Sequence, residues 1–192
     1  MKSYKQFIKE GKQDIDSICQ EYGIENYTIE DGLVNVRGDV DLACKNLTEL
    51  PLKFGKVTGY FSCHNNQLTS LEGCPQTVGG HFYCHNNQLT TLKGGPQKVG
   101  GNFYCHNNQL YGLDYLPVAK EYYLGGNPIF QIFKHFKWVE FYEVYILLKE
   151  FDVIRKLGNK YNLYMQRLEE VFNDLGYDIP YEIYKIEGYE II

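Results

Sequence analysis

Residues 78–98 read VGGHFYCHNNQLTTLKGGPQK, and nearly the same 21 letters precede them at 57–77 (VTGYFSCHNNQLTSLEGCPQT). A third, shorter copy follows at 99–117 (VGGNFYCHNNQLYGLDYLP). A degenerate unit at 36–55 comes before the copies, and a truncated unit begins at Val118. A fixed period of this length is the signature of a repeat architecture. Each unit must stack on its neighbours, because one unit alone cannot bury its apolar side chains.

Inside each copy the pattern is F-x-C-x-x-N-x-L-x-x-L. The F-x-C segment predicts a short strand whose side chains alternate between a buried and an exposed face. Stacking the copies places equivalent residues in columns along the solenoid. Four columns are predicted to be buried: Phe61, Phe82 and Phe103; Cys63, Cys84 and Cys105; Leu68, Leu89 and Leu110; Leu71, Leu92 and Leu113.

The asparagine of the pattern predicts an internal ladder. Its members are Asn66, Asn87, Asn108 and Asn127, whereas the first unit has Lys45 at this position. After the strand the chain turns, which leaves backbone groups without partners in the sheet. An asparagine amide both donates and accepts hydrogen bonds, so it satisfies such groups inside the fold.

The spacing resembles the grammar of leucine-rich repeats, L-x-L-x-x-N-x-L, with Phe and Cys in two apolar positions. The L-T-x-L ending followed by Pro resembles the short bacterial class, and the V-G-G-x-F-x-C form is also similar to repeats of large tailed phages. The resemblance covers residues 36–129. It implies an α+β repeat fold: a leucine-rich-repeat solenoid with parallel strands, capped by N-terminal and C-terminal helices.

The repeat cysteines have two interpretations. Redox or metal chemistry is one, and a small buried apolar side chain is the other. Free cysteine usually takes the second role, and every copy places Cys where a leucine-rich repeat has Leu, so we expect buried thiols. Cys19, Cys44 and Cys74 share no spacing with them.

Composition limits the class of protein. The 192 residues carry 19 basic and 24 acidic side chains, a formal net charge of −5, and 16% are aromatic. This balance disfavours a nucleic-acid partner, which calls for a cationic footprint. No apolar run is long enough for a membrane span or a signal peptide, so we expect the cytoplasm of a bacterial or phage-infected cell.

Removing the buried columns leaves an exposed strand face that is rich in Tyr, His and Asn and has no Lys or Arg. We call it the Tyr/His face, and its candidate partner-binding residues are Tyr60, His64, His81, Tyr83, His85, Asn102, Tyr104, His106 and Tyr123. Tyr is enriched at binding hot spots, and solenoids commonly bind through their strands. Duplication alone would also copy such a surface. We expect a protein partner; a small ligand, such as a sugar or nucleotide, is the alternative.

Catalytic, metal and cofactor sites are not expected. Ser62, His64 and Asp41 occupy neighbouring exposed positions, but no oxyanion hole or nucleophile elbow accompanies them. Three stacked His side chains are close enough for metal binding but not arranged to converge on one ion. Protonation of such a stack would make it repel itself, which predicts sensitivity to pH.

The flanks complete the predicted organisation: an N-terminal helical cap at 1–35, repeats at 36–129, and a C-terminal helical cap with a tail at 130–192. In the first cap, Ser3 and Gln6 form a capping-box pattern. In the second, helices are predicted at 128–136, 138–154 and 161–175, with an extended tail at 181–192. Whether the C-terminal helices are only a cap or also a second binding surface stays open, and so does the oligomeric state.

Overall fold

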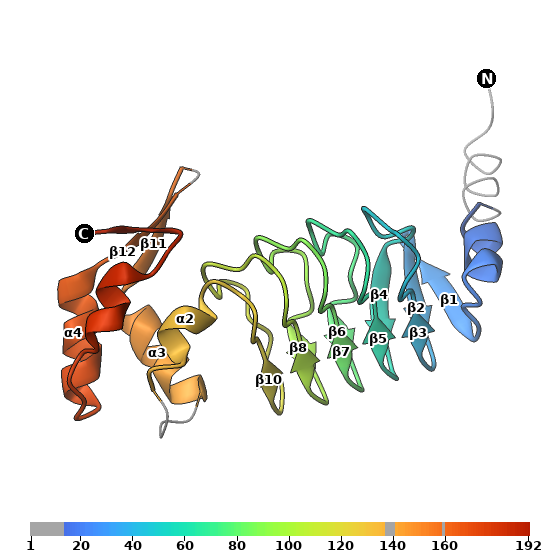
Figure 1. Ribbon diagram of the computed structural model, residues 1–192. Coiled ribbons are helices and arrows are strands. Elements are labelled where there is room, and N and C mark those ends of the chain that lie inside the picture. The colour runs from blue at the N-terminus through green and yellow to red at the C-terminus, as the bar shows by residue number, and fades with distance from the viewer. Residues whose placement is uncertain (1–13, 137–140, 159) are drawn as a thin grey trace.

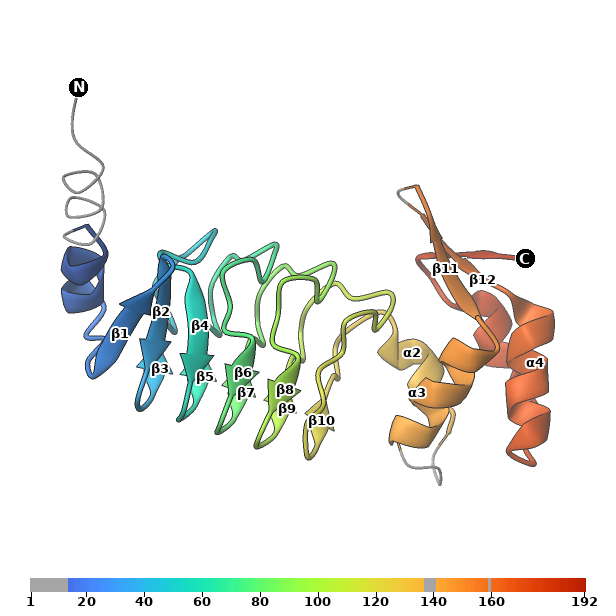
Figure 2. The ribbon, with the colours of Figure 1, turned by 180° about the vertical axis from the view of Figure 1, so that it is seen from behind.

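A computed structural model describes residues 14–136, 141–158 and 160–192. The predicted capping box at Ser3 and Gln6 lies outside these residues. The repeats form a β-solenoid of about four turns with parallel strands. Figures 1 and 2 show an elongated molecule, in which the N-terminal region and the C-terminal helices lie at opposite ends of the solenoid.

The F-x-C segments form one parallel sheet, which we call the front sheet. Its strands are β3 (Val40–Asp41), β5 (Phe61–Ser62), β7 (Phe82–Tyr83), β9 (Phe103–Tyr104) and β10 (Tyr122–Tyr123). They pair in strict register, each with the equivalent strand one turn away. The predicted strand at each F-x-C segment is therefore confirmed.

The sequence pattern did not predict that each turn carries a second strand. These strands form a back sheet of β1 (Tyr27–Glu30), β2 (Leu33–Val36), β4 (Phe54–Val57), β6 (Thr77–Val78) and β8 (Lys98–Val99). All its pairs are parallel except β1 with β2, which form an antiparallel hairpin at the N-terminal end. Through this hairpin, β1 becomes the edge strand at the N-terminal end of the back sheet. A helical segment at 14–20 precedes the hairpin (Figure 2).

The predicted columns make the core between the sheets. All twelve Phe, Cys and Leu side chains named above are buried. The rings of Phe61, Phe82 and Phe103 stack with centroids 5.6 Å apart and planes 8° from parallel. Stacking identical side chains at each turn buries apolar area without leaving voids, which is the main source of stability in such a fold.

The asparagine ladder is also confirmed. The Nδ2 group of Asn87 donates to the carbonyl oxygens of Cys63 and Cys84 at 3.0 and 3.1 Å, and its Oδ1 accepts the Leu68 N–H at 2.9 Å. Each asparagine therefore joins its own turn to the preceding one. Asn66, Asn108 and Asn127 repeat the arrangement, and all four are buried.

Two glycines permit the close stacking of turns. A Cβ on Gly79 would lie 2.1 Å from the carbonyl oxygen of Thr58, and one on Gly100 would lie 2.2 Å from that of Gly79. The backbones therefore approach more closely than any side chain allows.

All six cysteines are free thiols, and every one except Cys44 is buried. The repeat cysteines thus sit in the core, as the apolar interpretation predicts. Cys74 shares no spacing with them but contacts Cys63. The two residues belong to the same copy, and the chain after the front strand folds back so that Cys74 lies against that strand.

The C-terminal region is less helical than predicted. Its elements are α2 (Phe130–Phe133), α3 (Phe141–Glu150), β11 (Ile154–Leu157), β12 (Lys160–Leu163), α4 (Met165–Asp174), the 3-10 helix η1 (Tyr181–Lys185) and β13 (Tyr189–Ile191). The helix predicted at 161–175 begins only at Met165, since 160–163 form a strand of a three-stranded sheet, β11-β12-β13. β11 and β12 form an antiparallel hairpin, and Gly158, with φ +61°, lies in the turn between them. No helix in the described ranges has the length and apolar character to cross a bilayer.

Candidate functional site

Tyrosine rings form a continuous ladder on the front sheet. Tyr83 and Tyr104 stack with centroids 4.8 Å apart, and Tyr104 and Tyr123 with centroids 4.4 Å apart. Each ring projects from the outward position of its strand; Tyr83 and Tyr104 follow a buried Phe, and Tyr123 follows the half-buried Tyr122. Tyr123, at the end of the ladder, is 43% exposed, while Tyr83 and Tyr104 are half-buried by their neighbours.

A second ladder of imidazoles runs beside the first, two residues further along each turn. His64 and His85 stack at 4.4 Å between centroids, and His85 and His106 at 4.3 Å. Edge contacts link the two ladders, since the Tyr83 ring lies 6.3 Å from His64 and 6.2 Å from His85. The two ladders together form one continuous aromatic surface.

The middle imidazole of the ladder, His85, resists protonation. Burial, followed by repulsion from the like charges of His106 and His64, lowers the pKa of His85 from 6.5 to about 4. The pKa of His106 is also lowered, first by burial and then by His64. At neutral pH the rings of His85 and His106 are therefore uncharged.

The geometry of the imidazole ladder does not favour metal binding. Ring planes that lie 12° and 15° from parallel direct their nitrogen lone pairs side by side rather than toward one point. Within the described residues, no group of three or more His, Cys, Asp or Glu side chains is placed to hold a metal ion.

The remaining candidates form a third column, and part of it serves the solenoid itself. His81 Nδ1 accepts the backbone N–H of Asn102 at 2.9 Å, and the Asn102 amide donates to Glu121 Oε2 at 2.8 Å. Tyr60 meets Tyr83 edge to face at 6.2 Å. The structure thus brings all nine predicted residues onto one surface, but His81 and Asn102 also link successive turns.

Ser62 corrects the sequence interpretation of this surface. It was expected to be exposed, yet it is 2% exposed, and its Oγ lies 2.8 Å from His64 Nδ1. Asp41 instead accepts the backbone N–H of Ala43 at 3.0 Å, and no hydrogen bond joins Asp41 to His64. The three residues therefore do not assemble a catalytic triad.

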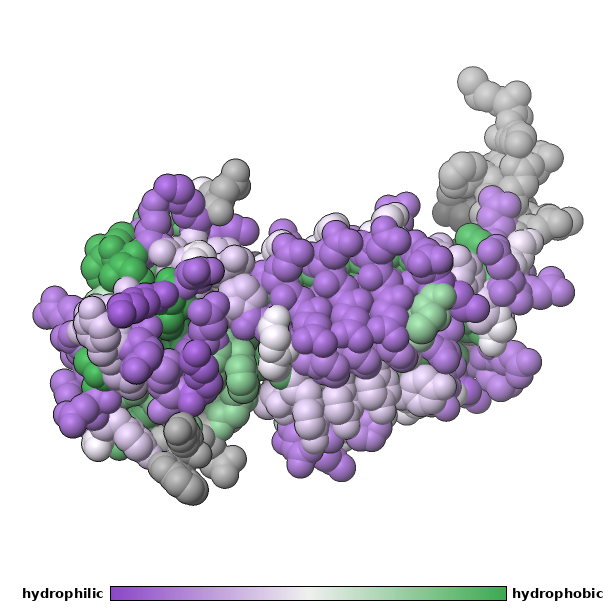
Figure 3. All heavy atoms as spheres, viewed as in Figure 1, coloured by the Kyte–Doolittle hydropathy of each residue, from purple (hydrophilic) through white to green (hydrophobic). Residues whose placement is uncertain are grey.

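Carboxylates lie at both ends of the Tyr/His face. Asp39 and Asp41 lie close enough to Tyr60 to raise its pKa, after the larger effect of burial. At the other end, Glu121 accepts a hydrogen bond from the Tyr123 hydroxyl at 2.9 Å and so raises the pKa of that hydroxyl. From the side seen in Figure 3, the solenoid surface is mostly hydrophilic, with a paler row running along it.

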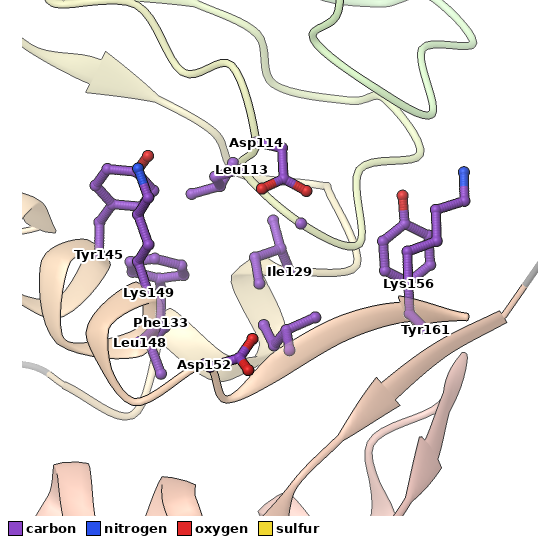
Figure 4. A pocket seen from close by; sticks show the side chains of 12 residues that line it. Leu113, Asp114, Ile129, Phe133, Tyr145, Leu148, Lys149, Asp152, Lys156 and Tyr161 are labelled. Atoms are coloured by element: carbon purple, nitrogen blue, oxygen red, sulfur yellow. The ribbon is translucent and has the colours of Figure 1, made fainter. Parts of the chain in front are cut away.

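Sequence reasoning missed a hollow where the last full repeat meets the C-terminal region. It is lined by Gly112, Leu113, Asp114, Ile129, Phe133, Tyr145, Leu148, Lys149, Asp152, Ile154, Lys156 and Tyr161 (Figure 4). One signal pointed to it: the third copy reads Tyr111-Gly112 where the others read Thr69-Ser70 and Thr90-Thr91. Tyr111 stacks on Tyr161 with centroids 5.3 Å apart, so the departure from the repeat marks the joint.

Comparisons of this chain with models of known protein families, with curated protein sequences and with solved structures gave no match.

Proposed function

We propose that this protein is a non-enzymatic interaction module that binds a partner protein through its Tyr/His face. The observation that carries the proposal is the pair of parallel aromatic ladders on one hydrophilic surface. Side chains held by mutual stacking are already ordered, so binding a partner costs little additional conformational entropy. Tyrosine then offers a rigid contact area with a hydroxyl at its tip.

The charge of this face specifies the partner further. The face has no Lys or Arg, a lowered pKa keeps His85 and His106 neutral, and Asp39, Asp41 and Glu121 lie at its ends. Such a surface complements a neutral or basic protein surface, because carboxylates pair with Lys and Arg and tyrosine rings attract cations. It opposes nucleic acid, whose phosphates require cationic contacts.

The leucine-rich-repeat resemblance supports the same proposal. The 21-residue spacing of parallel strands and the internal asparagine ladder are what that grammar implies, and such solenoids commonly bind through their strand surface. The likeness to phage repeats extends the proposal to a host protein, including a defence or regulatory factor, in the cytoplasm of an infected bacterium. This extension is by analogy, since a fold does not specify a function.

The alternative is a small sugar or nucleotide bound to the same face. Small-ligand sites are concave and cover most of the ligand. The in-register rings of the Tyr/His face instead form an extended ladder along the solenoid, which favours a macromolecular partner.

The decisive experiment is a pull-down from bacterial lysate, followed by binding measurements with the purified partner. The face variant carries Tyr83→Ala, His85→Ala, Tyr104→Ala and His106→Ala. The matched control carries Lys56→Ala, Thr77→Ala and Lys98→Ala on the outward positions of the back sheet. Loss of two tyrosine hot spots should weaken binding by about 30-fold or more.

A photocrosslinking amino acid at Tyr104 gives an independent readout that needs no truncated side chain. We expect it to label the partner, whereas the same amino acid at Thr77 should not. Equal binding by the face variant, measured after its melting temperature is shown to match the wild type, would contradict the proposal.

A further inference from the structure

The hollow beside Gly112 is a product of how the last full repeat differs from the others. Gly112 replaces Ser70 and Thr91 of the earlier copies. A Cβ added at Gly112 would lie 3.5 Å from Tyr161 Cε1 and 4.0 Å from Asp114 Oδ2, so the missing side chain leaves open space between these two residues. The third copy therefore lacks the hydroxyl side chain of the earlier copies at a position that faces Tyr161 of the C-terminal region.

The floor of the hollow is apolar and well formed. Leu113, Ile129, Phe133 and Leu148 line it, and each is at most 8% exposed. Its volume is about 110 Å³. An apolar cavity of about 150 Å³ takes up a benzene ring, so this one accommodates a group of about four or five carbon atoms.

The rim of the hollow is charged and carries two lysines and two aspartates. Figure 4 shows Tyr145 and Lys149 on one side of the hollow, Lys156 and Tyr161 on the other, and Asp114 between them. The two ammonium groups lie 5.9 and 5.3 Å from the centroids of the Tyr145 and Tyr161 rings.

The second carboxylate of the lining is already compensated. Asp152 forms ion pairs with Arg155 and Arg167, the latter at 3.1 Å, and the hydrogen bond from Arg155 is the main cause of its lowered pKa. Because these two arginines lie outside the lining and neutralise Asp152, the two lysines of the lining face one further carboxylate, Asp114, in a chain whose formal net charge is −5. This local excess of positive charge attracts an anion.

We propose that this hollow binds a small carboxylic acid with a branched aliphatic body of about four or five carbon atoms. The aliphatic body occupies the floor, and the carboxylate faces Lys149 and Lys156. This site is independent of the Tyr/His face, so each proposal stands or fails without the other.

The test uses the full chain with 4-methylpentanoate as the probe. Saturation-transfer NMR reports which probe protons contact the protein, and calorimetry gives the affinity. We expect the strongest transfer at the two methyl groups. The neutral 4-methylpentanamide has the same shape but lacks the charge that the lysines recognise. We expect its affinity to be lower by about tenfold or more.

Variants assign the binding to this hollow. Lys149→Gln and Lys156→Gln should each weaken acid binding by about tenfold, whereas Lys53→Gln, an exposed lysine in the N-terminal half of the solenoid, should not. Gly112→Thr restores the residue of the second copy and fills the opening, so it should remove binding while the chain stays folded.

Three results would overturn the proposal. One is equal affinity for the acid and the amide, and another is unchanged binding by Gly112→Thr or by the lysine variants. The third is no saturation transfer from millimolar 4-methylpentanoate.

Discussion

The imidazole rings of His85 and His106 lie face to face, with centroids 4.3 Å apart and planes 15° from parallel. His64 covers the other side of His85 in the same way, at 4.4 Å. Stacked rings on both faces leave His85 little access to water, and its Nδ1 is buried without a hydrogen-bond partner among the described residues. A proton on His85 would therefore be poorly solvated and would face two rings that repel it once they are charged.

This stack predicts that the protein loses stability in mild acid. The unfolded chain binds a proton at His85 near pH 6.5, while the folded chain does so only near pH 4. The unfolded state therefore binds more protons between these values, and the free energy of unfolding falls as the pH is lowered from 6.5 to 4. Thermal melting across this range should show a decrease that is smaller in a His85→Gln variant. If the difference in melting temperature between the wild type and His85→Gln did not change with pH, His85 would not be the source of the acid sensitivity.

The asparagine ladder predicts a large cost for a single substitution. Asn87→Ala removes two donated hydrogen bonds and leaves the buried Leu68 N–H without its acceptor. We expect the free energy of unfolding to fall by about 3 kcal/mol, measured by urea denaturation. Gln88→Ala, at the exposed adjacent position, should change it by less than about 0.5 kcal/mol. Similar values for the two variants would show that the ladder contributes little to stability.

Glycine contacts between turns predict a second contrast. Gly100→Ala would place a Cβ 2.2 Å from the backbone oxygen of Gly79, so neighbouring turns would have to separate, at a cost of about 2 kcal/mol or more. Gly125→Ala meets no atom within 4 Å and should be neutral to within about 0.5 kcal/mol. Urea denaturation of both variants checks the prediction, and a neutral Gly100→Ala would refute the close approach.

Tyr111 predicts how the C-terminal region is held to the solenoid. Its ring stacks on Tyr161 and meets Tyr189 at 5.4 Å, and its carbonyl oxygen accepts the Tyr189 hydroxyl at 2.7 Å. Tyr111→Thr, which restores the repeat residue, should remove about 1–2 kcal/mol of aromatic contact. Hydrogen exchange should then increase at 154–163 and 189–191 but not in the front sheet. An increase spread evenly over the whole chain would argue against a local joint.

Thiol exposure predicts a simple chemical pattern. Cys44 is the exposed cysteine, and the other five are buried. Burial raises the pKa of the Cys84 thiol well above its ordinary value, which further suppresses the reactive thiolate. Labelling of the native protein with a disulfide reagent should give one fast equivalent, lost in Cys44→Ser, and five more on denaturation. Several fast equivalents in the Cys44→Ser variant would mean that the core thiols are accessible.

The sequence by itself determined the solenoid, its parallel front sheet, its buried columns and its asparagine ladder. Near-identical copies at one period allow a single way of stacking in which every Phe, Cys and Leu meets its equivalent, so the local pattern also dictates the long-range contacts. The same logic placed the nine residues of the Tyr/His face on one surface. The prediction that Ser62 is exposed was wrong. Strand alternation points Ser62 outward, but its Oγ lies against the His64 ring, which belongs to the turn after the strand.

Only the tertiary structure decided the rest. The back sheet consists of segments as short as Thr77–Val78, which carry too few residues to show an alternating pattern. Residues 160–163 seemed to continue a helical pattern, but they pair with 154–157 on one side and 189–191 on the other. The hollow beside Gly112 exists because this C-terminal sheet and α3 meet one turn of the solenoid. Contacts between dissimilar segments far apart in the chain leave no periodic trace in the sequence, so they are defined only when the folded chain brings those segments together.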